Sequence, residues 1–559
     1  MVGRGPGTRS TRQSHEPYGG PLTRPSLSDT VLLDPTQAYR VQDTGTLRPT
    51  VFVADSLLVR GFHPDTESAL TAVAASAGFR LVWDAEHPER TKRPTRDREL
   101  IEGSALSDDS KRELLDIWVT RVRLTPLDSG SGHVFRPIDT WRLLQEFRAQ
   151  VDDPARRSDV ALEHPAELGI GTSPYTGGHG HGISGTPYTG GHPYTGGHPY
   201  TGGHPYTGGH AAALDEYALP GTGGRQPVAW VGSAPTPARM PAKARRPVVV
   251  ILDSGVGLHP WFGPDFVDNK PQVLGRRIGL ESIEDQLADT TGGVEDLLGG
   301  LGPDAGHGTF VAGIVRQACP EARILSVRMF RDNGVVDEFE LLEALQLLCL
   351  RQMLALTPRS GVEPFDVVSL SLGYYHEEPE DSAFDPLLRG PLDVLGRLGV
   401  AVVTSAGNDA TTRPCYPAAF APPRKNAAAD RKRVPLSAVG ALNPDGTIAL
   451  FSNDGRWVRF MRLGAGVVST IPTDLDGSDQ ATAAYTSRER QVRSSIDPDD
   501  FHGGFAVWSG TSFSAPLLAG QVAAGLVPGL ATNPSRAADV AIERSVEVLD
   551  ALPKRGRRP

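Results

Sequence analysis

The sequence predicts an α/β protein with two folded parts: a large domain at 247–553 built on a mostly parallel sheet, and a small α/β or α+β domain at 49–153. In the large region, nearly continuous apolar strands alternate with helical patterns, which is typical of a parallel sheet covered by helices on both faces. In the small region, the patterns follow the order strand–helix–strand, strand–helix. At 559 residues, and about 150 residues per domain, the chain is long enough for both.

Five short apolar runs are the strands expected in the large domain. They lie at 248–252, 322–330, 367–372, 401–405 and 434–441. The helical patterns fall near 308–318, 336–355, 384–398, 512–527 and 535–549. In a parallel sheet covered on both faces, ligand sites gather at the carboxyl ends of the strands, so polar motifs at those ends are candidates for function.

The small domain and the two chain ends have their own patterns. Strands are expected at 50–61, 79–84 and 119–127, with helices at 65–77 and 139–151. Residues 1–48 are polar and punctuated by prolines, so we expect a flexible arm there. The basic residues 554–559 are expected to form a solvated tail.

Residues 154–246 are rich in glycine, proline and histidine, and we expect them to form a linker. The hexapeptide PYTGGH occurs at 174–179 and four more times in tandem over 187–210. With so few bulky apolar side chains, the segment cannot offset the entropy lost on ordering. Its histidines could bind Zn²⁺, Ni²⁺ or Cu²⁺ loosely. No carboxylate or thiol completes a defined site, so the linker interpretation is favoured and no metal site is assigned.

Composition and charge argue against several classes of protein. The chain has 56 Lys and Arg against 66 Asp and Glu, a net charge of −10, which disfavours nucleic-acid binding. No apolar run approaches the roughly 20 residues that span a bilayer, so no membrane partner is expected. The N-terminus lacks the apolar core of a signal peptide, and Cys319, Cys349 and Cys415 form no disulfide framework. We therefore expect a cytoplasmic protein.

Two polar motifs follow or precede predicted elements of the large domain. Asp253, in Asp-Ser-Gly, directly follows the strand at 248–252, where a carboxylate needs a cation or a hydrogen-bond donor. His307 lies between two glycines at the start of a helical pattern, which leaves its imidazole uncrowded. Each motif alone is more often structural, as a turn aspartate or a core histidine.

Two further motifs could stabilise or form a reacting centre. Ser512 follows Gly-Thr at the start of an apolar helix, where backbone N–H groups and the helix dipole favour a developing negative charge. Asn408 closes the strand at 401–405, and its amide could donate to the same oxyanion. The structural alternatives are a helix-capping serine and a turn asparagine.

Taken together in this order, the four motifs resemble those of the subtilisin-like serine proteases, the subtilase or peptidase S8 family. Asp253 matches the aspartate of D-[ST]-G, and His307 the histidine of G-H-G-T-x-V-A-G. Asn408 matches the asparagine of A-G-N, and Ser512 the serine of G-T-S-x-[SA]-x-P. The resemblance implies a subtilisin-like three-layer α/β domain in the large region.

The resemblance also implies an activity and its residues. It implies a serine endopeptidase that cuts polypeptide substrates through an Asp253–His307–Ser512 triad and an acyl-enzyme, with Asn408 in the oxyanion hole. The substrate would bind as an added strand along a segment similar to the family's S-L-G. The substrate-binding residues expected are Ser371, Leu372, Gly373, Ser405, Ala406 and Gly407.

Several alternatives stay open. The protein could be a catalytically silent peptide-binding member of the fold, or a metal-responsive interaction protein that uses its histidine repeats. No cofactor is required. Relatives commonly hold structural Ca²⁺, and the acidic insert at 281–300 could supply oxygen ligands, although a solvated loop is favoured. Many relatives carry a propeptide that blocks the cleft. Residues 49–153 have the right size for one, but a retained domain that senses a regulatory partner is preferred.

Overall fold

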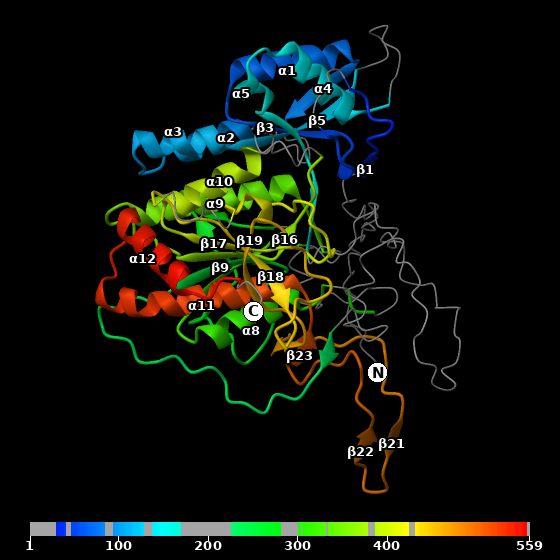
Figure 1. Cartoon of the computed structure of the whole chain (residues 1–559), viewed down its shortest axis with the longest axis vertical. Helices are drawn as coiled ribbons and strands as arrows, with labels where there is room; N and C mark the ends of the chain where they lie inside the picture. The colour runs from blue at the N-terminus through cyan, green and yellow to red at the C-terminus, as the bar shows by residue number, and fades with distance from the viewer. Residues whose placement is uncertain are drawn as a thin grey trace, which may run out of the picture.

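The computed structural model describes residues 30–40, 46–83, 93–127, 137–168, 225–280, 300–302, 304–330, 334–377, 386–423 and 431–555. These residues form a small N-terminal domain that lies on a larger C-terminal domain (Figure 1). The PYTGGH repeats, most of the predicted N-terminal arm, the acidic insert at 281–299 and the last four residues lie outside the described part of the chain.

The N-terminal domain is a four-stranded antiparallel sheet with the strand order β4-β5-β3-β6. Its elements are β3 (Ser56–Arg60), α1 (Pro64–Ser76), β4 (Phe79–Trp83), α2 (Arg93–Glu102), α3 (Asp108–Ile117), β5 (Val119–Pro126), α4 (Thr140–Gln150), α5 (Pro154–Arg157) and β6 (Val160–Leu162). Leu57 and Val59 of β3 pack in a core with residues of α1 and α4, whereas Leu58 faces the C-terminal domain. A separate antiparallel pair joins β1 (Thr30–Leu33) to β2 (Thr50–Val53).

Seven strands form the central sheet of the C-terminal domain, in the order β10-β13-β9-β15-β17-β18-β19. They are β9 (Val248–Asp253), β10 (Val267–Asp268), β13 (Arg323–Arg328), β15 (Val367–Leu370), β17 (Ala401–Ser405), β18 (Ser437–Leu442) and β19 (Val458–Leu463). Every neighbouring pair is parallel, which confirms the predicted parallel sheet. The sequence did not predict β10 or β19, the two strands at the edges of the sheet.

Helices cover both faces of this sheet (Figure 1). They are α8 (His307–Ala318), α9 (Glu338–Leu356), α10 (Pro386–Arg397), the short 3₁₀ helix η3 (Ala418–Phe420), α11 (Thr511–Thr532) and α12 (Ala538–Ala551). Val249 and Ile251 of β9 pack in one core with α8 and α11, while Val248, Val250 and Leu252 pack in the other with α9 and α10. The period of two along a strand thus builds the three layers.

Among the described helices, α11 alone has the length and hydropathy that could also suit a membrane span. Most of it is buried in the core that it shares with α8 and the sheet, so packing inside the domain accounts for its apolar character.

Short strands from distant parts of the chain form small additional sheets. These are β14 (Val335–Asp337) with β7 (Pro165–Leu168) and β16 (Leu372–Gly373); β20 (Val467–Thr470) with β23 (Phe505–Trp508) and β8 (Gln226–Pro227); β11 (Gln272–Val273) with β12 (Arg276–Arg277); and the projecting hairpin β21 (Ala484–Thr486) and β22 (Val492–Ser494). The predicted linker at 154–246 is therefore too wide. Its first fifteen residues contain α5, β6 and β7, and β8 lies near its other end.

Candidate active site

Asp253 and His307 meet at the carboxyl end of the central sheet. Asp253 is the last residue of β9, and His307 is the first residue of α8. His307 Nδ1 and Asp253 Oδ1 lie 2.8 Å apart, and both side chains are buried. The Asp253 carboxylate also accepts a hydrogen bond from the backbone N–H of Ser254. The carboxylate is therefore held in place on one side of the imidazole.

Glycine is required where α8 starts beside the turn that follows β9. A Cβ atom on Gly308 would lie 2.1 Å from the carbonyl oxygen of Gly255, closer than any real contact. The backbone N–H of Gly308 donates to Ser254 Oγ at 3.0 Å, which ties the helix start to the same turn. Close approach of two backbone segments therefore sets the distance between Asp253 and His307.

The charges around His307 set its basicity. Burial lowers the pKa of His307, but the charge of Asp253 and its hydrogen bond, with Asp304 adding to them, outweigh burial and raise the pKa above its ordinary value. Arg225 opposes this rise. The imidazole is thus a stronger base than a histidine in water.

Ser512 is the second residue of α11. Its neighbour Phe513 packs with a ring-centroid distance of 5.2 Å from the ring of His307. The Ser371 hydroxyl donates to the carbonyl oxygen of Ser512 at 2.9 Å, and the Ser512 hydroxyl lies 3.5 Å from the carbonyl oxygen of Ser371. Ser371 directly follows β15, so the sheet and α11 are joined at this serine.

Asn408 is held by the residue before Ser512. Its Oδ1 accepts hydrogen bonds from both the backbone N–H and the hydroxyl of Thr511, each at 2.8 Å. Because Asn408 Oδ1 faces Thr511, the Nδ2 group of the same amide points away from Thr511. Ser405, Ala406 and Gly407 form the buried end of β17 and the turn that carries Asn408.

A residue from a fourth segment supports this turn. Asn453 Oδ1 accepts the backbone N–H groups of Asp409 and Thr411 at 2.9 and 3.1 Å, and its Nδ2 donates to the carbonyl oxygen of Ala406. Gly407 has a φ of 102°, and a Cβ atom there would lie 2.2 Å from Asn453 Nδ2. Asn453 is a positioning residue to which the sequence analysis assigned no role.

The chain's own strand β7 lies along the predicted substrate-binding segment. Glu167 and Leu168 pair antiparallel with Gly373 and Leu372 of β16. On its other side β7 pairs antiparallel with β14. Ser371, which contacts Ser512, immediately precedes β16. An extended segment of the chain therefore already pairs with β16, which directly follows Ser371.

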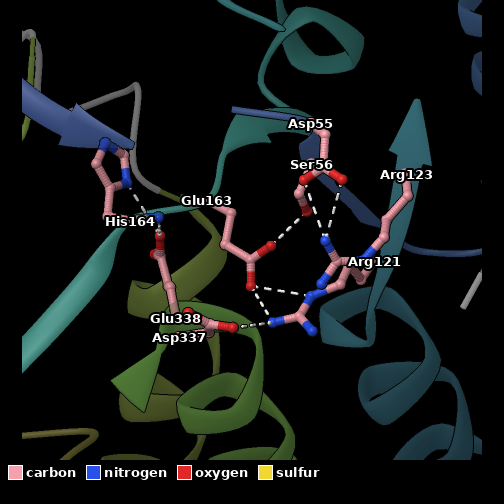
Figure 2. A network of polar contacts seen from close by, with 8 residues as sticks. All are labelled: Asp55, Ser56, Arg121, Arg123, Glu163, His164, Asp337 and Glu338. Atoms are coloured by element: carbon pink, nitrogen blue, oxygen red, sulfur yellow. Dashed lines mark hydrogen bonds and ion pairs between the residues drawn. The ribbon is translucent and has the colours of Figure 1, made fainter. Parts of the chain in front are cut away.

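A buried polar network, shown in Figure 2, joins the two domains where β7 begins. His164 Nδ1 lies 3.0 Å from Glu338 Oε2, and His164 Nε2 lies 2.9 Å from Glu377 Oε2. Burial lowers the pKa of His164, but the hydrogen bonds and charges of the two glutamates outweigh it and raise the pKa to about 10. His164 is thus a cation at neutral pH, held between two carboxylates of the C-terminal domain.

A second buried cation completes the network, which we name the interdomain latch: Arg121, Glu163, His164, Asp337, Glu338 and Glu377. Arg121 bridges Glu163 of its own domain and Asp337 of the other, the latter at 3.0 Å. Buried charges are stable only when paired. Separating the domains would take Asp337 away from Arg121, which keeps Glu163, and would take both glutamates away from His164.

Two expectations about metals remain predictions. The acidic insert at 281–300 lies almost wholly outside the described residues, as do the histidine repeats. In the described part of the chain, ligating atoms of Asp476, Asp500 and His502 come within 4.8 Å of one another, and these residues are exposed or half-exposed. Such groups are common without an ion, so no metal role is assigned to them.

Comparisons with known proteins identify the family of this chain. Residues 244–530, about half of the chain, match the subtilase family model. A thermophilic serine proteinase from Bacillus sp. (strain AK1) is 29% identical over 175 residues, which cover 30% of this chain and 36% of that relative. A solved structure of a lanthipeptide protease aligns with 54% of this chain and 79% of that protease chain, at 17% sequence identity and a TM-score of 0.32. The chain belongs to the subtilase family, peptidase S8.

Proposed function

We propose that this protein is a serine endopeptidase in which Ser512 is the nucleophile and His307 the general base. The observation that carries the proposal is the 2.8 Å contact between His307 and Asp253, together with the packing of Phe513, the residue after Ser512, against the His307 ring. A serine hydroxyl is a poor nucleophile at neutral pH, and a histidine next to it supplies a base of suitable pKa.

In the proposed reaction, His307 Nε2 takes the Ser512 proton as Oγ attacks the carbonyl carbon of the scissile peptide bond. His307 then gives that proton to the leaving amine, and the acyl-enzyme that remains is hydrolysed by water. Asp253 holds the tautomer in which Nδ1 carries the proton and stabilises the imidazolium that forms. The buried Asp253–His307 contact supports these roles.

The tetrahedral intermediate carries a negative charge on the former carbonyl oxygen. We assign its stabilisation to the Asn408 amide and the Ser512 backbone N–H, at the N-terminal end of α11. The Thr511 contacts to Asn408 Oδ1 support this assignment, because they fix the amide before the substrate binds. Loss of one such donor costs about 3–4 kcal/mol of transition-state stabilisation, a value known from a subtilisin.

The substrate would bind as a strand between β14 and β16. The pairing of β7 with both strands supports this, since a polypeptide segment fits there with main-chain hydrogen bonds on each side. The same pairing supports the proposal that residues 49–168 regulate the enzyme by blocking it: β7 and a substrate cannot occupy one position together.

A fluorophosphonate probe tests the nucleophile. We expect the wild-type chain to be labelled at Ser512 and the Ser512→Ala variant to remain unlabelled. Ser514→Ala is the matched control, because this buried serine lies on the same helix and donates to the backbone carbonyls of Arg462 and Leu463. Mass spectrometry of the labelled peptide identifies the site.

Because β7 fills the position proposed for the substrate, labelling should be measured on the intact chain and on a chain cut at a rare protease site inserted at residue 186. Labelling of neither form, with both folded, would contradict the proposal and favour a catalytically silent peptide-binding protein. The metal-responsive alternative would be favoured if Zn²⁺ or Ni²⁺ changes the labelling rate of the intact chain and has no effect on a chain that lacks residues 169–210.

A glycine substitution tests the backbone packing behind the catalytic pair. Gly308→Ala is expected to lower the rate of labelling by about 100-fold, since a new Cβ must displace either His307 or the β9 turn by about 1 Å. The control is Gly503→Ala, whose Cβ would meet nothing within 4 Å. Equal labelling rates in Gly308→Ala and wild type would show that this contact does not set the geometry.

A further inference from the structure

Arg225 is a buried cation that the sequence analysis placed in the linker. It lies outside residues 244–530, the part of the chain that matches the family model. The next two residues form β8, which pairs antiparallel with Ala506 and Val507 of β23. Strand β23 leads into the turn that carries Ser512. The backbone at Arg225 is therefore fixed beside the strand that precedes the proposed nucleophile, and its side chain is only 1% exposed.

The guanidinium of Arg225 packs against an aromatic ring that in turn packs against His307. It lies 5.2 Å from the ring centroid of Trp508, and its Nη2 donates to the carbonyl oxygen of Gly302 at 2.7 Å. The Trp508 ring meets the His307 imidazole edge to face, with centroids 5.5 Å apart and planes at 81°. The two separations put the charge of Arg225 within about 11 Å of the imidazole.

Two carboxylates face this cation. Burial lowers the pKa of Arg225 to about 10, while Asp304 and Asp499 act in the opposite direction. The arginine is therefore charged at neutral pH. Asp304 also lies close to the catalytic pair, because its carbonyl oxygen accepts the backbone N–H of His307 at 3.0 Å. A fully buried arginine is costly unless its charge is paired. Here the Arg225 charge interacts with Asp304, which also acts on His307.

We propose that Arg225 is a positioning residue of the active site, which holds Trp508 against the His307 imidazole and supplies a fixed positive charge that offsets Asp304. The inference rests on the proposed function, because it assigns Arg225 a role through His307. It follows that the functional C-terminal domain begins at or before Arg225, about twenty residues before the match to the family begins.

In the described part of the chain, the charged groups that act on the pKa of His307 lie in three segments. They are Asp253 at the end of β9, Asp304 in the turn before α8, and Arg225 before β8. Removing the Arg225 charge leaves the two carboxylates unopposed, so the imidazolium becomes more stable. With a unit charge at about 10 Å and an effective dielectric constant of about 20 to 40, the pKa of His307 should rise by about half to one unit.

Histidine NMR titration tests this directly in the full-length chain. The background is Ser512→Ala, which excludes self-cleavage, and His307→Gln assigns the resonance. We expect Arg225→Met to raise the pKa of His307 by about half to one unit, and Arg225→Lys, which keeps the charge, to leave it near the starting value. Arg239→Met, an exposed arginine of the same segment, is the control and should cause no change.

The result that would overturn the inference is a His307 pKa that is the same in folded Arg225→Met and Arg225→Lys chains. If Arg225→Met does not fold, Asp304→Asn gives the test with opposite sign. It should lower the pKa of His307. An unchanged pKa of His307 in a folded Asp304→Asn chain would contradict the proposed balance between Asp304 and Arg225. The titration needs no turnover, so a wild-type chain that no probe labels would contradict the proposed function and still leave this inference decidable.

Discussion

Replacement of His307 by alanine is expected to slow both peptide hydrolysis and covalent labelling of Ser512 by about 10⁶-fold, the size of loss known for a subtilisin that lacks its catalytic histidine. The physical reason is that no other base takes the Ser512 proton, and a neutral serine attacks a peptide carbonyl very slowly. Asp253→Asn should cost less, about 10⁴-fold, since the imidazole stays in place but its useful tautomer is no longer favoured.

The measurement is the second-order rate of fluorophosphonate labelling, with thermal unfolding to show that each variant is folded. His502→Gln, an exposed histidine outside the proposed site, is the control and should label at the wild-type rate. Wild-type labelling of a folded His307→Ala chain would show that Ser512 uses a different base.

The dependence of the labelling rate on pH gives an independent check of His307 as the base. The base must be neutral, and its pKa lies above the ordinary 6.5, so labelling should fall with acid already above pH 6.5.

Breaking the interdomain latch is the second large effect that we expect. In the double variant Asp337→Asn, Glu338→Gln, Arg121 and His164 each lose one carboxylate partner. Removal of one member of a buried ion pair costs about 3–5 kcal/mol, so the N-terminal domain should bind at least about 100-fold more weakly. Peptide hydrolysis by the intact chain should rise in parallel, because β7 then leaves the position between β14 and β16 more often.

The binding constant can be measured with a Ser512→Ala chain cut at residue 186 and separated into its two parts. Glu543→Gln, an exposed carboxylate on α12, is the matched control. Unchanged binding in the double variant would show that the apolar contacts of the interface hold the domains together without the latch. Binding that weakens with no gain in hydrolysis would show that β7 does not block the enzyme.

The latch also predicts the direction in which pH acts on the docked domain. The pKa of His164 is raised from 6.5 to about 10 by docking, so the protonated form favours the docked state. This contribution is complete below about pH 6.5 and is lost as the pH rises through about 10. Alkali should therefore loosen the latch at His164, and mild acid should not.

The sequence and the structure agree best where a local pattern is strong. The run at 248–252 is observed as β9, and the alternating burial of its residues follows from two layers of helices against one sheet. The motifs of Asp253, His307 and Ser512 were predicted at strand ends and helix starts, and the structure has them at the end of β9 and at the starts of α8 and α11. Each motif carries its own local signal, so its place could be predicted without the rest of the chain.

Strands β7 and β8 show where sequence reasoning fails. Both contain proline, both are too short to give a clear alternating apolar pattern, and both lie within the segment predicted to be a linker. Their hydrogen bonds come from strands more than 100 residues away, and no local propensity reports such a partner. Arg225 was missed for the same reason: an arginine in a proline-rich and glycine-rich stretch gives no sign that it will be buried.

The sequence by itself determined the family and the parallel sheet, and it predicted the reacting side chains that we propose, because catalysis needs particular groups at particular turns. Only the tertiary structure decided that β7 lies between β14 and β16, that His164 and Arg121 join the two domains, and that Arg225 reaches Trp508 beside His307. These contacts depend on long-range pairing and on burial of charge. Both are properties of the folded chain and of no single segment.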